Sequence, residues 1–216
     1  MALSKADFNN INVTPAASKK LKWNASANGF ETGDVGGSMV LLSTQTASGS
    51  ANLSFTSGID STYKEYVFKF INIHPSGANR FQFNGSIDAG SNYNVVKTTT
   101  NFTSQHDEDE GETASLLYQG GDDLAQSTGF QDLMSYGNMD DDNDHNLNGM
   151  LHLYNPASTT FVKHFIATTQ ANIDSNYSNN GFVAGYFNNT NDVDAIRFQM
   201  NSGNIDAGTI KMYGIT

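Results

Sequence analysis

Cysteine is absent from this 216-residue chain, and proline occurs only three times. Without cysteine the chain can form no disulfide framework and no thiolate metal site, so its stability has to come from packing or from assembly. No apolar run approaches the roughly 20 residues that span a bilayer, and Met1–Phe8 lacks the apolar stretch of a signal peptide. We therefore expect no membrane insertion and no Sec-type export.

Positive charge is also scarce, with 11 Lys and Arg against 22 Asp and Glu and a net charge of −11. Affinity for nucleic acid is built mainly from clustered Lys and Arg, so we expect no nucleic-acid partner. The negative charge is concentrated in residues 103–148, which hold twelve acidic residues and no Lys or Arg. We expect an acidic insertion there, of the functional or mobile kind, with a short helix around Thr128–Met134.

Short alternating or apolar runs, separated by Gly, Asn, Asp and Ser, occupy the chain from Ser38 onward and predict β-strands. In Ala195–Met200, for example, Ile196, Phe198 and Met200 alternate with polar residues. The predicted strands are Met39–Thr44, Ala51–Phe55, Tyr66–Ile73, Arg80–Asp88, Tyr93–Phe102, Met150–Asn155, Phe161–Thr169, Phe182–Asn188, Ala195–Met200 and Thr209–Ile215. Their number and spacing predict an all-β, jelly-roll-like antiparallel β-sandwich.

Residues 1–35 differ in composition from the remainder and predict an extended basic N-terminal arm, followed by a sandwich domain over 36–216. The arm combines lysines with scattered apolar residues, including the only tryptophan. Apolar anchors flanked by charge are typical of docking segments, whereas folding back onto the chain's own domain is the alternative interpretation. The residues expected to dock are Phe8, Ile11, Lys19, Lys20, Leu21, Lys22 and Trp23.

One acidic run offers oxygen ligands at alternate positions, Asp140, Asp142 and Asp144, and predicts a site for Ca²⁺ or Mg²⁺. The run does not match an EF-hand, because His145 stands where the sharp turn needs glycine and Leu151 stands where a bidentate Glu is needed. A solvated acidic loop without an ion is the interpretation that so acidic a segment favours, and we expect no cofactor apart from this candidate ion site.

Catalytic patterns are weak in this sequence. There is no G-x-S-x-G nucleophile elbow, and the many carboxylates single out no pair for glycoside cleavage. His152 and His164 lie on strands expected to form a hairpin, where they could share a metal if the strand register makes them face each other. Ordinary half-buried histidines are the alternative, and we expect no enzymatic activity.

Several segments carry a resemblance that covers nearly the whole chain. They resemble recurring stretches in structural proteins of tailed bacteriophages, especially marine ones, and include a closing strand of the type Gly-x-Ile-x-x-Tyr-Gly. That family has no well-defined catalytic residues to transfer to this chain. The matching segments are Leu21–Asp34, Phe70–Pro75, Asn155–His164 and Gly203–Gly214.

The resemblance implies a virion protein that is made in the host cytoplasm and displayed on the particle exterior. We expect a capsid decoration (cement) protein, docked by its arm onto other virion proteins of the capsid or tail. The alternatives are a tail-fibre or receptor-binding module that contacts host glycans and, more remotely, a small polysaccharide depolymerase. Two segments, Tyr66–Ile73 and Phe161–Ala167, carry bulky apolar residues on both faces, which is typical of central strands or of strands that also meet a neighbouring subunit. For a virion protein, the second interpretation favours a homotrimer or another closed oligomer.

Overall fold

The structure, a computed structural model, describes residues 19–34, 38–111, 114–134, 136–174 and 176–216. These residues form strands and connecting turns, with no helix among them. The described residues therefore contain no helix that could cross a membrane. The chain divides into two compact units, residues 1–40 and 41–216. The predicted boundary at residue 35 lies outside the described residues.

Part of the predicted arm is a β-hairpin rather than a single extended strand. Strand β1 (Lys19–Trp23) pairs antiparallel with β2 (Phe30–Asp34), so that Trp23 lies opposite Phe30. The turn is closed by the Asn24 backbone N–H, which donates to the Gly29 carbonyl at 2.9 Å. The Asn, Ala, Ser and Gly residues of this turn are typical turn formers, a signal that the composition of the arm had obscured.

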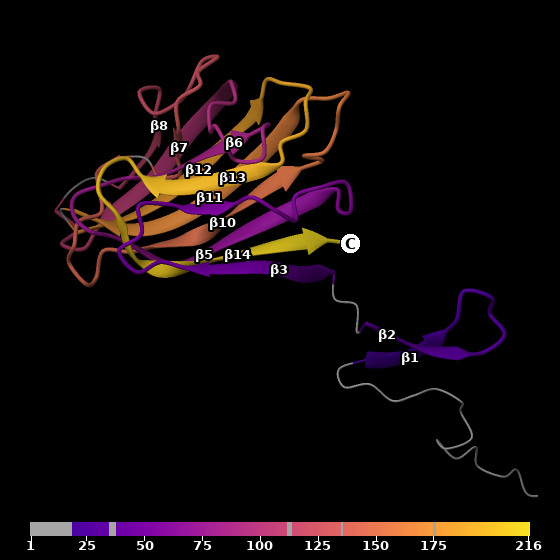
Figure 1. The fold of residues 1–216 in the computed structure, drawn as a ribbon. Coiled ribbons are helices and arrows are strands. Elements are labelled where there is room, and N and C mark those ends of the chain that lie inside the picture. The colour runs from indigo at the N-terminus through magenta and orange to yellow at the C-terminus, as the bar shows by residue number, and fades with distance from the viewer. Residues whose placement is uncertain (1–18, 35–37, 112–113, 135, 175) are drawn as a thin grey trace, which may run out of the picture. The chain divides into compact units, whose positions relative to one another are not determined.

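The second unit is built on an eight-stranded antiparallel sheet, in the order β3-β14-β5-β10-β11-β12-β7-β8. Figure 1 shows these strands side by side in that order. Their bounds are β3 Met39–Thr46, β5 Glu65–Pro75, β7 Lys97–Asp107, β8 Ser115–Tyr118, β10 Leu147–Tyr154, β11 Lys163–Ile173, β12 Tyr177–Phe187 and β14 Ile205–Ile215. A four-stranded sheet, β4-β13-β6-β9, comprises β4 Leu53–Phe55, β6 Phe81–Ser86, β9 Gln131–Asp132 and β13 Ala195–Met200.

Aromatic rings join the inner faces of the two sheets. Phe198 of the small sheet lies 5.3 Å from Phe68 and 5.2 Å from Phe70 of the large sheet, measured between ring centroids. Phe83 similarly lies 5.0 Å from Phe165 at an angle of 86°. These edge-on contacts between buried rings are the core of a two-layer sandwich. The predicted all-β, jelly-roll-like sandwich is therefore confirmed.

Each of the ten predicted strands overlaps an observed one, and Ala195–Met200 has the same bounds as β13. The largest displacement is at Tyr93–Phe102, because β7 runs from Lys97 to Asp107. The predicted helix at Thr128–Met134 is wrong: Gln131 and Asp132 form β9 and pair with β6. Tertiary pairing decided this short segment, whose local sequence does not strongly favour either structure.

Candidate functional site

The hairpin carries five of the seven residues predicted to dock, and all five residues of β1 are exposed. Leu21 and Trp23 share one face with Phe30, and the indole stacks on the Phe30 ring with centroids 4.4 Å apart. Lys20 and Lys22 point to the other face, because side chains alternate along a strand. The hairpin thus presents an exposed apolar face backed by lysines. Phe8 and Ile11 lie outside the described residues.

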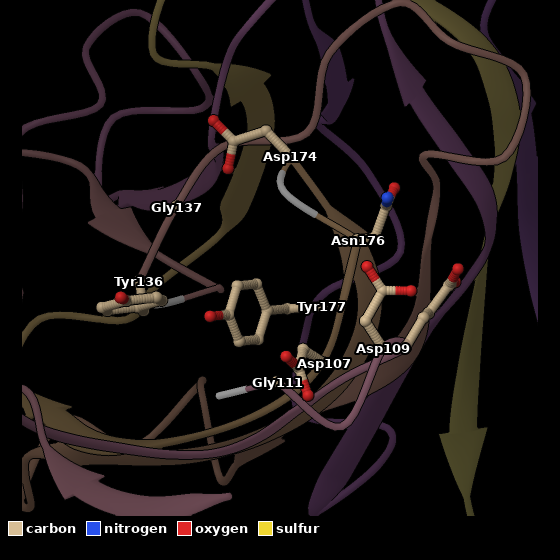
Figure 2. A pocket seen from close by; sticks show the side chains of 9 residues that line it. Asp107, Asp109, Gly111, Tyr136, Gly137, Asp174, Asn176 and Tyr177 are labelled. Atoms are coloured by element: carbon tan, nitrogen blue, oxygen red, sulfur yellow. The ribbon is translucent and has the colours of Figure 1, made fainter. Parts of the chain in front are cut away.

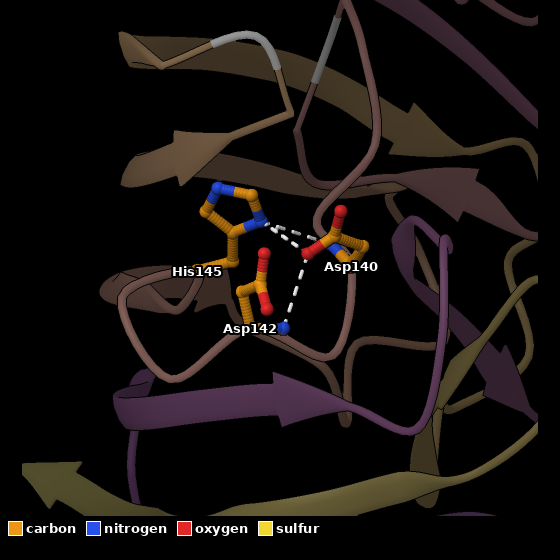
Figure 3. Close-up of side chains that lie close together, drawn as sticks. All are labelled: Asp140, Asp142 and His145. Carbon is orange, nitrogen blue, oxygen red and sulfur yellow. Dashed lines mark hydrogen bonds and ion pairs between the residues drawn. The ribbon is translucent and has the colours of Figure 1, made fainter.

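Two of the three predicted metal ligands come together in the loop before β10. Figure 3 shows Asp140 bridging the loop: its Oδ1 lies 2.5 Å from His145 Nδ1 and accepts the Asp142 N–H at 3.1 Å. The Asp142 backbone N–H and then His145 lower the pKa of the Asp140 carboxyl. Asp144 is exposed, with its Oδ1 4.0 Å from His145 Nε2. The grouped side chains are therefore Asp140, Asp142 and His145, with ligand atoms within 4.8 Å of one another.

This group can act in two ways. A divalent ion could take one oxygen from each aspartate and one nitrogen from His145, which is the only buried member of the group. Without an ion, the same contacts close the loop, and His74 Nε2 adds a hydrogen-bonding contact of 3.1 Å to the Asp142 carbonyl. Sequence reasoning counted His145 only against an EF-hand, because its approach to Asp140 depends on the turn that the loop makes.

Two basic residues outside the acidic insertion hold it against the sandwich. Arg80 Nη1 donates to Asp122 at 2.7 Å and to Asp132 at 3.3 Å. Burial raises the pKa of Asp132, an effect that Gln82 and Arg80 oppose. Lys97 is fully buried and donates to the Gly129 carbonyl at 2.5 Å. Part of the negative charge that the sequence places in the acidic insertion, at Asp122 and Asp132, is therefore paired with Arg80 and holds the insertion to the sandwich.

A pocket of about 630 Å³ lies where β7 ends and β12 begins, and the sequence did not predict it. Asp107 pairs with Tyr177 across these strands, and Tyr136 lies edge-on to Tyr177 with ring centroids 6.3 Å apart. Figure 2 shows Tyr177 between Tyr136 and Asp109. The pocket lining has four carboxylates and no lysine or arginine: Asp107, Glu108, Asp109, Gly111, Tyr136, Gly137, Asp174, Asn176 and Tyr177.

Acidic oxygens and tyrosine rings in one hollow can hydrogen-bond to hydroxyl groups and stack on an apolar ring face. The same carboxylates favour a cation over an anion. One part of this pocket had a signal in the sequence, the acidic run that follows His106. Asp174 and Tyr177 are distant in sequence, and only the pairing of β7 with β12 brings them to that run.

The two histidines considered for a metal do not pair with each other. The register of β10 with β11 places His152 opposite Ile166, so His164 lies diagonally from it. His152 Nδ1 instead lies 2.5 Å from Glu65 Oε1, while the His164 ring tilts toward Tyr186 with centroids 5.9 Å apart. Neither histidine belongs to a group of three or more potential metal ligands among the described residues.

The outer face of the large sheet, turned away from the small sheet, carries no formal charge over five neighbouring strands. The only Lys, Arg, Asp or Glu residues in β7, β8, β10, β11 and β12 are Lys97, Asp107 and Lys163, and all three are buried. We call the outward side chains of these five strands the uncharged face. One row across it, opposite one another in register, is Tyr118, Phe102, Phe182, Thr168 and Met150.

Comparisons of the chain with protein-family models, with curated proteins and with solved structures each found no match. A function for this chain therefore rests on its own residues and their geometry.

Proposed function

We propose that this chain is a non-enzymatic structural protein on the exterior of a tailed bacteriophage particle, most specifically a capsid decoration protein. In this proposal it is made in the host cytoplasm and attaches to another virion protein through the β1–β2 hairpin. The phage setting comes from the sequence resemblance. The attachment comes from one observation, the exposed apolar face of the hairpin.

That face is large for so small an element. The exposed fractions are 41% for Leu21, 61% for Trp23 and 41% for Phe30. An isolated two-stranded hairpin is only marginally stable in water, and burying a large apolar side chain contributes about 1.5–3 kcal/mol. A partner that covers these three side chains would stabilise the hairpin and gain affinity from the same contacts.

The charges of the hairpin indicate what kind of partner fits. Lys22 pairs with Glu31 at 3.2 Å, but both side chains are about half exposed, so this ion pair contributes little. Lys22 can therefore exchange this ion pair for contacts with a partner, and Lys20 lies on the same face. The partner surface that suits the hairpin is an apolar groove whose acidic rim extends to the lysine face.

Attachment can be tested by measuring incorporation of variants into particles. We expect Trp23→Ala and Leu21→Ser to lower the amount of the protein in purified particles, because each removes part of the apolar face. Phe161→Ala is the matched control, since Phe161 is 69% exposed but lies in the second unit. Normal incorporation of a variant that carries both hairpin substitutions would refute docking through the hairpin.

Copy number tests the decoration role separately. A decoration protein should be present in numbers comparable with the major capsid protein, whereas a fibre protein should be far rarer. Release of reducing sugar from host envelope material by the purified chain would overturn the non-enzymatic assignment.

The pocket at Asp107 and Tyr177 favours a second candidate, a tail-fibre or receptor-binding module that contacts a host glycan. Its volume of about 630 Å³ lies within the range of small-ligand sites. Tyr136→Ala should then weaken binding to host cells or to a glycan array, because it removes one of the two rings. Phe161→Ala should bind normally, and equal binding by both variants would remove this candidate.

A further inference from the structure

We infer that two copies of this chain associate through the uncharged face, packed face to face about a two-fold axis. The inference concerns the chain in solution, so it goes beyond the proposed function and does not depend on it.

The uncharged face mixes neutral polar side chains with a group of exposed aromatic and aliphatic ones, and this apolar group resembles the core of an interface. Phe102, Met150 and Ile166 are 41%, 39% and 50% exposed, and Tyr118 is 64% exposed. Phe102 stacks on Phe182 with ring centroids 4.7 Å apart. Interface cores are depleted of charged residues and enriched in aromatic residues and methionine, which is the composition observed here.

The face has both a projection and a hollow, as a self-complementary surface requires. Ile166 is the projection, half exposed on β11. Beside it lies a hollow of about 480 Å³ whose lining includes Thr98, His164 and Tyr186, with Ala184 as a small residue among these larger ones. In a two-fold arrangement each copy can place its projecting residues in the hollow of the other.

The size of the face matches what a stable pair needs. A strand of 11 residues, such as β7, β11 or β12, is about 36 Å long, and five neighbouring strands span about 24 Å. Because β8 and β10 are shorter, the flat area is roughly 700 Å². Standard interfaces bury about 800 Å² on each partner.

Charge selects a second copy as the occupant. Two chains that each carry a net charge of −11 repel each other in most relative orientations. Twelve of the acidic residues lie in the insertion at 103–148. The uncharged face has no Lys, Arg, Asp or Glu of its own, and the carboxylates that contact it, Glu65 beside His152 and Asp123 beside Tyr118, lie at its two edges. Two copies can therefore meet over its centre without placing like charges against each other. A single face that packs on its own copy closes at two subunits, so of the closed oligomers expected from the sequence we infer a dimer instead of a trimer.

The first test is the mass of the full chain by sedimentation velocity over a range of concentrations. We expect the wild type to be a dimer and Ile166→Asp to weaken the pair by more than about 100-fold, because it buries an unpaired carboxylate twice per dimer. Phe161→Asp is the matched control and should remain dimeric, since Phe161 lies on the turn before β11 and outside the uncharged face.

A second test keeps the inference falsifiable if Ile166→Asp fails to fold. The chain has no cysteine, so one introduced cysteine can crosslink only to its own copy. With a flexible bismaleimide, which bridges cysteines that face the partner without lying on the two-fold axis, Ile166→Cys and Met150→Cys should form crosslinked dimers much faster than Phe161→Cys. A monomeric wild type, a trimer, or equal crosslinking of all three variants would each overturn the two-fold pair, while leaving hairpin docking untouched.

Discussion

We expect the stability of the wild-type chain to rise with pH above neutrality, and replacing Lys97 by methionine should abolish this rise. Lys97 is fully buried at the start of β7, and its ammonium group contacts three neutral oxygens, those of Asn84, Val95 and Gly129. Burial lowers the pKa of this side chain from 10.5 to about 7. Methionine preserves most of the aliphatic stem and removes the charge.

The direction of the pH dependence follows from the number of protons that the folded and unfolded chains bind. Between pH 7 and 10.5 the unfolded chain keeps the Lys97 proton while the folded chain has largely lost it, so raising the pH favours folding. The slope is at most about 1.4 kcal/mol per pH unit, or about 2.7 kcal/mol from pH 7.5 to 9.5. The three oxygen contacts favour the ammonium form, which makes this an upper bound. As the pH falls through about 7 the folded chain also takes up the proton, and well below that pH both states are protonated and the slope vanishes.

The measurement is urea unfolding followed by far-ultraviolet circular dichroism at several pH values. It should stop below pH 10, because burial raises the pKa of Tyr66 and this favours unfolding once the tyrosine ionises in the unfolded chain. Lys163→Met is the matched comparison: burial lowers the Lys163 pKa too, but Asp192 opposes that effect. Wild-type and Lys97→Met chains with the same pH slope would refute the assignment of a depressed pKa to Lys97.

Three further predictions concern the insertion and the sheet. Arg80→Met should destabilise the fold by about 2–4 kcal/mol at pH 7, because it leaves Asp132 buried without its cation. Because burial raises the pKa of Asp132, the loss should shrink as the pH falls and this carboxylate takes up a proton; a loss in urea unfolding that does not change with pH would contradict this. Ca²⁺ at 100 times its dissociation constant should stabilise the wild-type fold by about 2.7 kcal/mol and leave the stability of Asp142→Ala unchanged. A wild-type melting temperature that changes with neither Ca²⁺ nor chelator would refute the ion site. Gly208→Ala should lower the free energy of unfolding by about 2 kcal/mol or more, because Gly208 has φ 119° and an added Cβ would lie 2.6 Å from the Asn72 carbonyl oxygen. An unchanged midpoint in urea unfolding would show that the β5–β14 bulge relaxes around the added methyl group.

The sequence predicted features that depend on near neighbours. The alternation in Ala195–Met200 identified β13 residue for residue, because one face of that strand meets the core and the other does not. The hairpin at Lys19–Asp34 was missed because its turn residues were interpreted as part of an extended arm. Similarly, the helix expected near Gln131 was wrong because a partner strand, not local preference, decides its conformation.

Features that depend on register or burial were beyond reach from the sequence. A lysine is almost never fully buried, so no pattern could single out Lys97. The pocket joins Asp107 to Tyr177 through a pairing between strands distant in sequence, and a slip of one residue would have moved every side chain to the other face. For the same reason the sequence could indicate Asp140 and Asp142 as candidate metal ligands. It could not show that the third member of the group is His145 and not Asp144.

The stacking of Trp23 on Phe30 gives the chain a natural spectroscopic reporter. Trp23 is the only tryptophan, and it lies in the first unit, while the nine tyrosines lie at Tyr63 and beyond. Tryptophan emission therefore follows the hairpin, and tyrosine absorbance follows the sandwich. A partner that covers the indole should shift its emission to shorter wavelength with the tyrosine signal unchanged, so one unlabelled sample can report attachment and unfolding as separate events.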